Sequence, residues 1–221
     1  MPSQRPASFY SDKFKVGHNK EIKLKDWLTD DNERPVTRAE GEELLKTDIL
    51  KLSELQEKLY ASNRYSVLIV IQAMDAAGKD SVIKHVMSGL NPQGVIVTPF
   101  KTPSHQELEH DYLWRHYIAQ PARGMVGIFN RSHYENVLVT KVHPEYILNE
   151  NLPGIKSVSD IDKSFWEKKD TDRSIILKES SLTMAPLFSN FFFMFPRRNK
   201  KNVFLNVSTT LPKIGNFQRR I

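Results

Sequence analysis

YSVLIVIQAMDAAGKDS, residues Tyr65 to Ser81, decides the fold of this chain. An apolar run rich in β-branched residues passes into a turn of small residues, and a helix-like segment follows. A strand, a tight turn and a helix N-terminus together offer converging backbone N–H groups, the positive end of a helix dipole and one lysine ammonium, which are the groups that hold a phosphate. The sequence therefore predicts a loop that binds the phosphates of a ligand through Ala76, Ala77, Gly78, Lys79, Asp80 and Ser81.

The loop departs from the usual pattern G-x-x-x-x-G-K-[ST] at two positions. Ala73 replaces the first glycine, and Asp80 follows the lysine, so the hydroxyl is displaced to Ser81. A hydroxyl directly after the lysine binds Mg²⁺ in P-loop nucleotide hydrolases, and its absence argues against that class. Asp75, inside the loop, would be repelled by phosphates unless a cation bridges them or it accepts a proton from the attacking group. We predict that Asp75 is catalytic and binds a metal; the alternative is that it only caps the loop.

The composition fits a single enzyme domain. The chain has 221 residues, of which 39% are hydrophobic and 26% charged, and this is enough for one sizeable core. It has no cysteine, which excludes disulfides, cysteine metal sites and cysteine nucleophiles. No apolar run reaches the length of a membrane helix, and the N-terminus has no signal pattern. We expect a cytoplasmic protein that does not bind membranes.

Apolar segments alternate with helical patterns in the middle of the chain. Residues 1–34 are polar and irregular and predict an N-terminal arm. Thr37 and Glu40 then form a capping-box pattern at the start of a helix. Further strands are predicted at about Ser66–Ala73, Val95–Thr98 and Gly124–Phe129, with helices between them at Asp80–Gly89 and Glu107–Tyr117. This order predicts an α/β fold, a doubly wound parallel sheet with flanking helices and with ligands at the carboxyl ends of its strands.

Polar motifs follow the second and third of these strands. Lys101 and Arg115 lie in the segment that follows the second strand, and both can reach an anionic chain. A solvated helix is an equally good explanation of this segment. Its residues Glu107, His110, Asp111 and Trp114 have helical spacing and are predicted to share a face.

Asn130 and Arg131 end the third apolar segment. Asn130 can offer an oxygen to Mg²⁺, and Arg131 can neutralise charge on a transferring phosphoryl group. His133 is predicted to be a hydrogen-bonded neighbour of this site rather than a metal ligand.

The segments MDAAGKD, FKTPSHQELEHDYLWR and IFNRSHYENVLV, in this order and spacing, resemble the polyphosphate kinase 2 family over residues 10–167. The resemblance implies a P-loop kinase fold that moves a phosphoryl group between inorganic polyphosphate and a nucleoside mono- or diphosphate (AMP, ADP or GDP), with Mg²⁺. It implies Asp75 as the catalytic acid, Lys79 as the phosphate-binding lysine and Asn130-Arg131 as the second motif. Many members have Asp at the positions of Asn130 and Asn136. Self-association is compatible with the family.

Other functions fit the phosphate loop as well. A P-loop kinase that uses ATP to phosphorylate a nucleotide or a metabolite would need the same loop. A non-catalytic phosphate-binding protein, or a pseudogene product without function, would also retain it.

Residues 168–221 have a different character from the rest. They hold 11 Lys/Arg against 3 Asp/Glu, whereas residues 1–167 hold 21 against 23, so the net charge of +6 comes from this tail. The resemblance stops after Trp166. When codons are read one nucleotide earlier, residues 183–204 can become NGTIIFKFFLHVSKEEQKERF, which resembles the continuation of the family. We therefore expect a frameshift in the gene or its record near residues 167–169, and no nucleic-acid partner for the basic charge.

A frameshift has consequences for the whole chain. It divides the sequence into the arm (1–34), a partial P-loop kinase-like α/β domain (35–167) and a non-family tail (168–221). It would remove the basic lid helix that the family places there, together with the last part of the sheet. We expect an incomplete C-terminal part and a truncated chain that is poorly folded or inactive.

Overall fold

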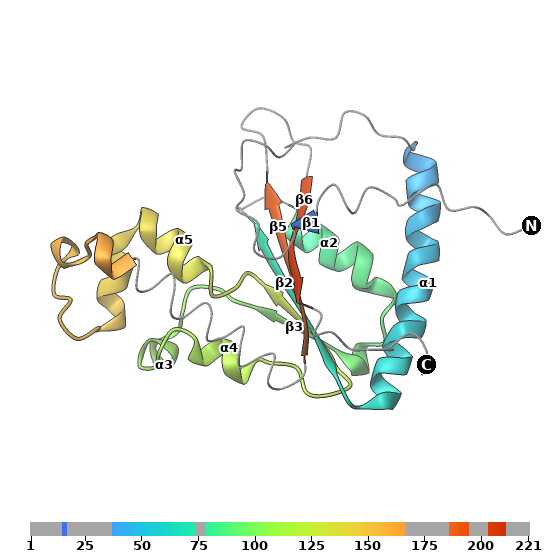
Figure 1. Cartoon of the computed structure of the whole chain (residues 1–221), viewed down its shortest axis with the longest axis horizontal. Helices are drawn as coiled ribbons and strands as arrows, with labels where there is room; N and C mark the ends of the chain where they lie inside the picture. The colour runs from blue at the N-terminus through green and yellow to red at the C-terminus, as the bar shows by residue number, and fades with distance from the viewer. Residues whose placement is uncertain (1–14, 17–36, 74–77, 167–185, 195–202, 211–221) are drawn as a thin grey trace, which may run out of the picture.

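The computed structural model describes residues 15–16, 37–73, 78–166, 186–194 and 203–210. Within them the chain forms a six-stranded sheet in the order β1-β6-β5-β2-β4-β3 with helices packed against it (Figure 1). The strands are β1 (Lys15–Val16), β2 (Ser66–Ala73), β3 (Val95–Pro99), β4 (Val126–Asn130), β5 (Pro186–Met194) and β6 (Val203–Thr210). The helices are α1 (Arg38–Ser62), α2 (Lys79–Val86), α3 (His105–Leu108), α4 (Trp114–Ile118) and α5 (Glu135–Val142), with short 3₁₀ helices at η3 (Met87–Gly89), η4 (Pro92–Gly94), η5 (Pro144–Glu150) and η6 (Val158–Asp160).

The capping box predicted at the start of α1 is confirmed. The Thr37 side chain accepts from the Glu40 backbone N–H at 3.3 Å, and the Glu40 carboxylate accepts from the Thr37 N–H at 2.7 Å. Further along α1, the buried amide of Gln56 donates to the Asn91 carbonyl at 2.9 Å and accepts from the Asn91 N–H at 2.7 Å. These two bonds fasten α1 to the turn that precedes β3.

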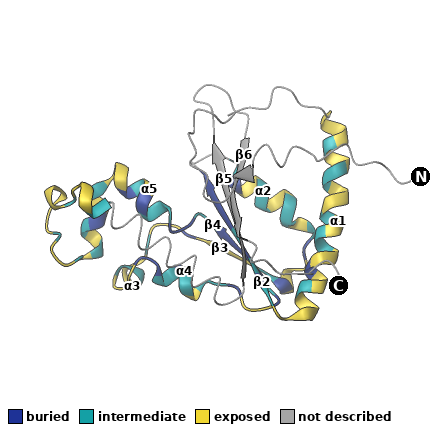
Figure 2. Ribbon diagram, viewed as in Figure 1, coloured by how far each residue is buried: buried dark blue, intermediate teal, exposed yellow. Residues whose placement is uncertain are grey.

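Helices cover both faces of the central strand β2, as a doubly wound sheet requires. On one face, Ile71 and Ala73 pack with residues of α1 and α2, among them Leu59 and Val82. On the opposite face, Leu68 and Val70 join a second cluster, to which Phe100, Phe129 and Ala119 contribute. The neighbouring strand β4 is buried along most of its length (Figure 2). The unbroken hydrophobicity of the β2 sequence follows from this double coverage.

The strand order creates a switch point at the carboxyl end of β2. β2 pairs in parallel with β4 on one side and with β5 on the other, whereas β3, the next strand in the sequence, lies beyond β4. The chain thus leaves β2 in one direction and later returns on its other side. Ligands of open α/β sheets bind where such connections diverge. The register pairs Ile71 with Asn130, so the predicted phosphate loop and the Asn130-Arg131 motif begin at the same edge.

The single helix predicted over residues 107–117 is wrong. The structure has α3 and α4 instead, because the Asp111 side chain accepts from the Leu113 N–H at 3.0 Å and starts a new turn. Asp side chains favour such local bonds over a continuous helix. The shared face predicted for Glu107, His110, Asp111 and Trp114 is therefore not formed, although the His110 and Trp114 rings stack at 4.1 Å.

Two strands come from the segment that the sequence predicted to be a non-family tail. β5 lies parallel to β2, and β6 pairs antiparallel with β5. The alternative reading frame also encodes an apolar, β-prone run, IIFKFFLHV, over the residues of β5. Codons with thymine at the second position encode apolar residues, so a thymine-rich stretch is apolar in neighbouring frames. A strand beside β2 is thus compatible with either frame.

None of the helices in these described parts of the chain is both long and apolar enough to cross a membrane.

Candidate active site

The described residues include only the end of the predicted phosphate loop. Asp75, Ala76 and Ala77 lie outside them, and the roles predicted for these three residues stay predictions. Gly78 directly precedes α2 with a φ of 87°, a conformation that glycine adopts without steric strain. Lys79 is the first residue of α2, and its exposed fraction is only 8%. A buried lysine thus begins a helix, at the end where the helix dipole favours phosphates.

Asp80 and Asn130 are brought together by the meeting of α2 and β4. The Asn130 Nδ2 donates to the Asp80 Oδ1 at 2.7 Å. This bond sets the orientation of the Asn130 amide. Its Oδ1 is buried and has no hydrogen-bond partner among the residues that the structure describes.

An unpartnered buried oxygen is the feature that a Mg²⁺ site needs here. Mg²⁺ takes oxygen ligands and usually keeps several waters, so a single amide oxygen with one or two carboxylates suffices. Asn130 Oδ1 and the Asp80 carboxylate fit this donor set, and the metal-ligand role of Asp75 stays a prediction. The described residues include no group of three or more His, Asp or Glu side chains placed to hold a metal by themselves.

Arg131 occupies a strained position immediately after β4. Its φ of 70° is left-handed, which costs about 1 kcal/mol for a residue with a Cβ. Its N–H donates to the Ile71 carbonyl at 3.0 Å, and its Nη1 lies 3.4 Å from the Glu135 Oε2. The other carboxylate oxygen of Glu135 accepts from the Gln72 side chain, which in turn accepts from the Ser132 hydroxyl. The turn that carries Arg131 is therefore tied to β2.

Neither Gln72 nor Glu135 was predicted from the sequence as a residue of this site. A signal for Gln72 was present, because it is the one amide side chain in the apolar strand Ser66–Ala73. Glu135 belongs to the segment IFNRSHYENVLV, but no rule of sequence spacing connects it with its partner Gln72.

Lys101 and Arg115 line one small cavity together with Ser132 and Glu135. The cavity measures about 60 Å³, far below the ~300 Å³ of a small-molecule site, so it holds no nucleotide by itself. Arg115 lies 3.2 Å from the Glu107 carboxylate and above the Phe100 ring, 5.0 Å from its centroid.

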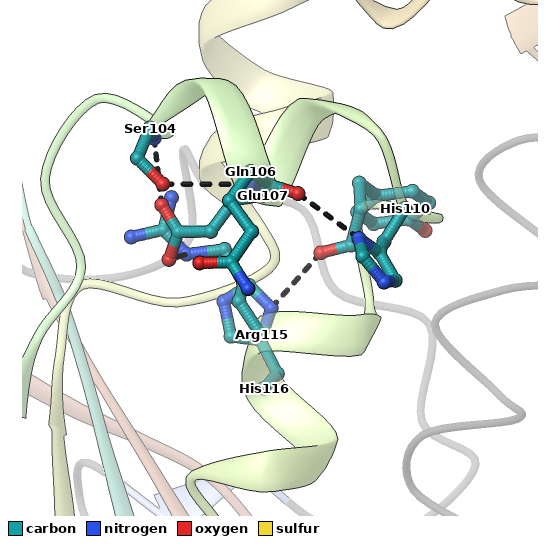
Figure 3. A network of polar contacts seen from close by, with 7 residues as sticks. Ser104, Gln106, Glu107, His110, Arg115 and His116 are labelled. Carbon is teal, nitrogen blue, oxygen red and sulfur yellow. Dashed lines mark hydrogen bonds and ion pairs between the residues drawn. The ribbon is translucent and has the colours of Figure 1, made fainter.

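Figure 3 shows Arg115 of α4 next to Glu107 of α3, whose carboxylate also caps α3 by accepting from the Ser104 N–H. Burial lowers the pKa of Arg115, and the charge of Glu107 opposes this shift. Arg115 thus has a carboxylate partner that any anionic ligand would have to share. The role predicted for Arg115 stays a prediction, as does that of Lys101.

His116, which also lines this cavity, forms a buried pair with His133, with ring centroids 5.8 Å apart. His116 Nδ1 lies 3.2 Å from the Tyr112 carbonyl (Figure 3), and both ring nitrogens of His133 lack a hydrogen-bond partner among the described residues. The hydrogen-bonded role predicted for His133 is therefore not seen there. Burial, with the nearby charge of His133, lowers the pKa of His116 to about 3, and burial lowers the pKa of His133 to about 4.

We expect acid to destabilise the protein through this pair. Both pKa values lie below the ordinary 6.5 of the unfolded chain, so the unfolded state binds more protons in the interval between them. The stabilisation is fully present above pH 6.5 and is lost as the pH falls toward 4. At about pH 5 the loss amounts to about 2 kcal/mol for each histidine. Urea unfolding at about pH 7.5 and about pH 5 measures it.

The matched pair of variants is His116→Gln and His85→Gln. His85 is exposed on α2, and His85→Gln serves as the exposed-position control. Equal pH dependence in the His116→Gln variant and the unchanged chain would contradict the assignment.

The chain is similar to known proteins over most of its length. The family model described as Polyphosphate kinase 2 matches residues 36–176. An ADP-polyphosphate phosphotransferase of Rhodopseudomonas palustris is 48% identical over 156 residues, which are 71% of this chain and 53% of the relative. An AMP/ADP-polyphosphate phosphotransferase of Meiothermus ruber is 54% identical over 92 residues, 42% of this chain and 34% of the relative.

The fold comparison gives the same result. The crystal structure of polyphosphate kinase 2 from Arthrobacter aurescens superposes with a TM-score of 0.65 and 34% identity, covering 79% of this chain and 57% of that one. The chain spans about half the length of the Rhodopseudomonas palustris relative. With 141 consecutive residues matched by the family model, from 36 to 176, the chain belongs to the polyphosphate kinase 2 family.

Proposed function

We propose that the α/β domain transfers a phosphoryl group between inorganic polyphosphate and a nucleoside mono- or diphosphate, with Mg²⁺, in the cytoplasm. One observation carries the proposal: Asp80, which follows Lys79 at the N-terminus of α2, accepts a hydrogen bond from Asn130 at the switch point of the sheet. The names of the relatives, which act on ADP or on AMP and ADP, support polyphosphate as the donor. They support it over an ATP-dependent kinase and over a protein that only binds phosphate.

The chemistry asks little covalent work of the protein. A P–O bond of polyphosphate breaks and a new one forms to the terminal phosphate oxygen of the nucleotide, so positioning and charge neutralisation dominate. Lys79 and the N–H groups of Ala76, Ala77 and Gly78 hold the phosphates, while Arg131 neutralises the transferring group. Asp75 orients the accepting oxygen. Mg²⁺, when bound by Asp75 and Asn130, neutralises charge on the phosphoryl oxygens.

Replacing Asn130 with aspartate is expected to strengthen metal binding. The new carboxylate would face Asp80, which lies 2.7 Å from the Asn130 amide, and two repelling carboxylates bind a divalent cation more tightly than one. We expect the affinity for Mn²⁺, a paramagnetic substitute for Mg²⁺, to rise about tenfold, and the melting temperature without metal to fall. Electron paramagnetic resonance titration measures the affinity.

The control for this experiment is Asn149→Asp, which adds the same charge at an exposed position of η5. An equal rise in Mn²⁺ affinity in both variants would show that only net charge matters. That result would remove Asn130 from the metal site.

The activity test compares donors and acceptors directly. The chain with its reading frame restored after residue 167 is incubated with Mg²⁺ and AMP, ADP or GDP, with either polyphosphate or ATP as the donor, and the nucleotides are separated by chromatography. The proposal expects the acceptor to gain a phosphate with polyphosphate alone. Transfer that requires ATP in every reaction would favour the ATP-dependent kinase instead.

We also propose that residues 35–167 form the family domain and that residues 168–221 follow a shifted frame. The family match from 36 to 176 supports the first boundary; it runs nine residues past the second, to residue 176. The backbone of β5 completes the sheet beside β2. We therefore expect the chain to bind phosphates but to transfer them poorly without its family continuation.

A further inference from the structure

Gln72 is a buried amide at the end of the central strand β2. Its exposed fraction is 6%, and it shares its face of the strand with Leu68 and Val70 in the core. Burying an amide is unfavourable unless both its ends form hydrogen bonds, so an apolar residue would be the default choice at this position. The hydrogen-bond partners of Gln72 therefore indicate why a polar residue occupies this position.

Both ends of the Gln72 side chain bond to the turn after β4. Its Oε1 accepts from the Ser132 hydroxyl at 2.9 Å, and its Nε2 donates to the Glu135 Oε1 at 2.5 Å. Ser132 has an exposed fraction of 2%, and its oxygen also accepts from the Tyr134 N–H at 3.2 Å. The Gln72 side chain therefore connects two residues of the segment after β4, Ser132 and Glu135.

This turn carries Arg131. Glu135 contacts the Arg131 Nη1 through Oε2, at 3.4 Å, while its Oε1 is bound to Gln72. Without the Gln72 amide, both carboxylate oxygens could turn toward the guanidinium and form the bidentate pair that Arg and carboxylates favour. Arg131 would then be held by Glu135 and not by a phosphate. The backbone φ of 70° at Arg131 also depends on the turn staying against β2.

We propose that Gln72 is a positioning residue: by dividing the two oxygens of Glu135 and anchoring Ser132, it orients Arg131 toward the phosphates. The inference rests on the phosphate-binding role proposed for Arg131. According to this inference, β2, the strand before the phosphate loop, directly helps to order the Asn130-Arg131 motif.

Tripolyphosphate binding to the 221-residue chain tests the proposal. Gln72→Met keeps the length and burial of the side chain and removes both hydrogen bonds. Gln56→Met is the matched control, because Gln56 is equally buried and also forms two hydrogen bonds. Its partner Asn91 precedes β3 and so lies at the amino ends of the parallel strands, whereas the site lies at their carboxyl ends. Both variants are expected to lose similar stability in thermal unfolding. We expect only Gln72→Met to weaken the tripolyphosphate affinity measured by calorimetry, by about tenfold.

A double-mutant cycle separates positioning from general damage. In an Arg131→Ala background, Gln72→Met should no longer change the affinity, because the residue through which it acts is absent. Ser132→Ala, a smaller change that folds more readily, should weaken binding in the same direction by about threefold. These results would support the proposal.

Three outcomes would overturn it. In the first, Gln72→Met and Gln56→Met weaken tripolyphosphate binding equally. In the second, Gln72→Met weakens binding as strongly in the Arg131→Ala background as in the unchanged chain. In the third, neither Gln72→Met nor Ser132→Ala alters the affinity. A different result would contradict the proposed function itself: the unchanged chain shows a cooperative thermal unfolding transition, and so is folded, but does not bind tripolyphosphate. This inference would then be contradicted as well.

Discussion

Replacing Asp75 with asparagine is expected to reduce phosphoryl transfer from polyphosphate about a thousandfold. The amide keeps the size of the side chain but can neither accept a proton nor offer a full negative charge to Mg²⁺. Tripolyphosphate binding should change much less, because phosphate binding is proposed for Lys79 and the loop N–H groups and not for Asp75. The rate is measured in the chain with its reading frame restored after residue 167, with saturating ADP, polyphosphate and Mg²⁺.

Asp48→Asn provides the control, since Asp48 lies on the exposed surface of α1 and pairs only weakly with Lys51 at 3.6 Å. Its rate should equal that of the unchanged protein. A near-normal rate in Asp75→Asn would refute the catalytic role of Asp75 and leave it as a loop cap.

Restoring the reading frame is expected to have the second largest effect. The alternative frame supplies NGTIIFKFFLHVSKEEQKERF and, by the family resemblance, a basic lid helix in place of residues 168–221. Cationic side chains that close over a transferring phosphoryl group contribute large rate factors, about a thousandfold or more. We expect polyphosphate-dependent ATP formation in the restored chain to exceed that of the 221-residue chain by at least about this factor.

Resequencing the gene across codons 160–175 and beyond codon 221 shows whether the shift lies in the gene or in its record. Equal activity in the two chains, together with a cooperative thermal transition in the 221-residue chain, would contradict the frameshift proposal. Residues 186–194 would then be a native strand in their present frame.

Local sequence signals predicted the parts of the fold that local physics determines. The eight-residue apolar strand, the Thr37–Glu40 capping box and the Gly78-Lys79 turn each have a short-range cause, and each was found where the sequence placed it. The parallel order of β2, β3 and β4 followed from the alternation of strands and helices. Because carboxyl ends of parallel strands meet at one edge, Asn130 could also be expected near the start of α2.

The rest depends on contacts between distant residues. The bridge from Gln72 to Glu135 spans 63 positions, and no spacing rule connects them. The bond between Asp80 and Asn130 spans 50 positions in the same way. The break between α3 and α4 was missed because helical periodicity continues through Asp111, while its side-chain bond to Leu113 starts a new turn.

The most direct measurement is the transfer of ³²P from labelled polyphosphate to ADP by the frame-restored chain in the presence of Mg²⁺. The account predicts labelled ATP, and it predicts that Lys79→Met, which removes the positive charge of a buried residue at the start of α2, abolishes the label transfer. Unlabelled nucleotide from a folded, tripolyphosphate-binding protein would contradict phosphoryl transfer and leave a protein that only binds phosphates.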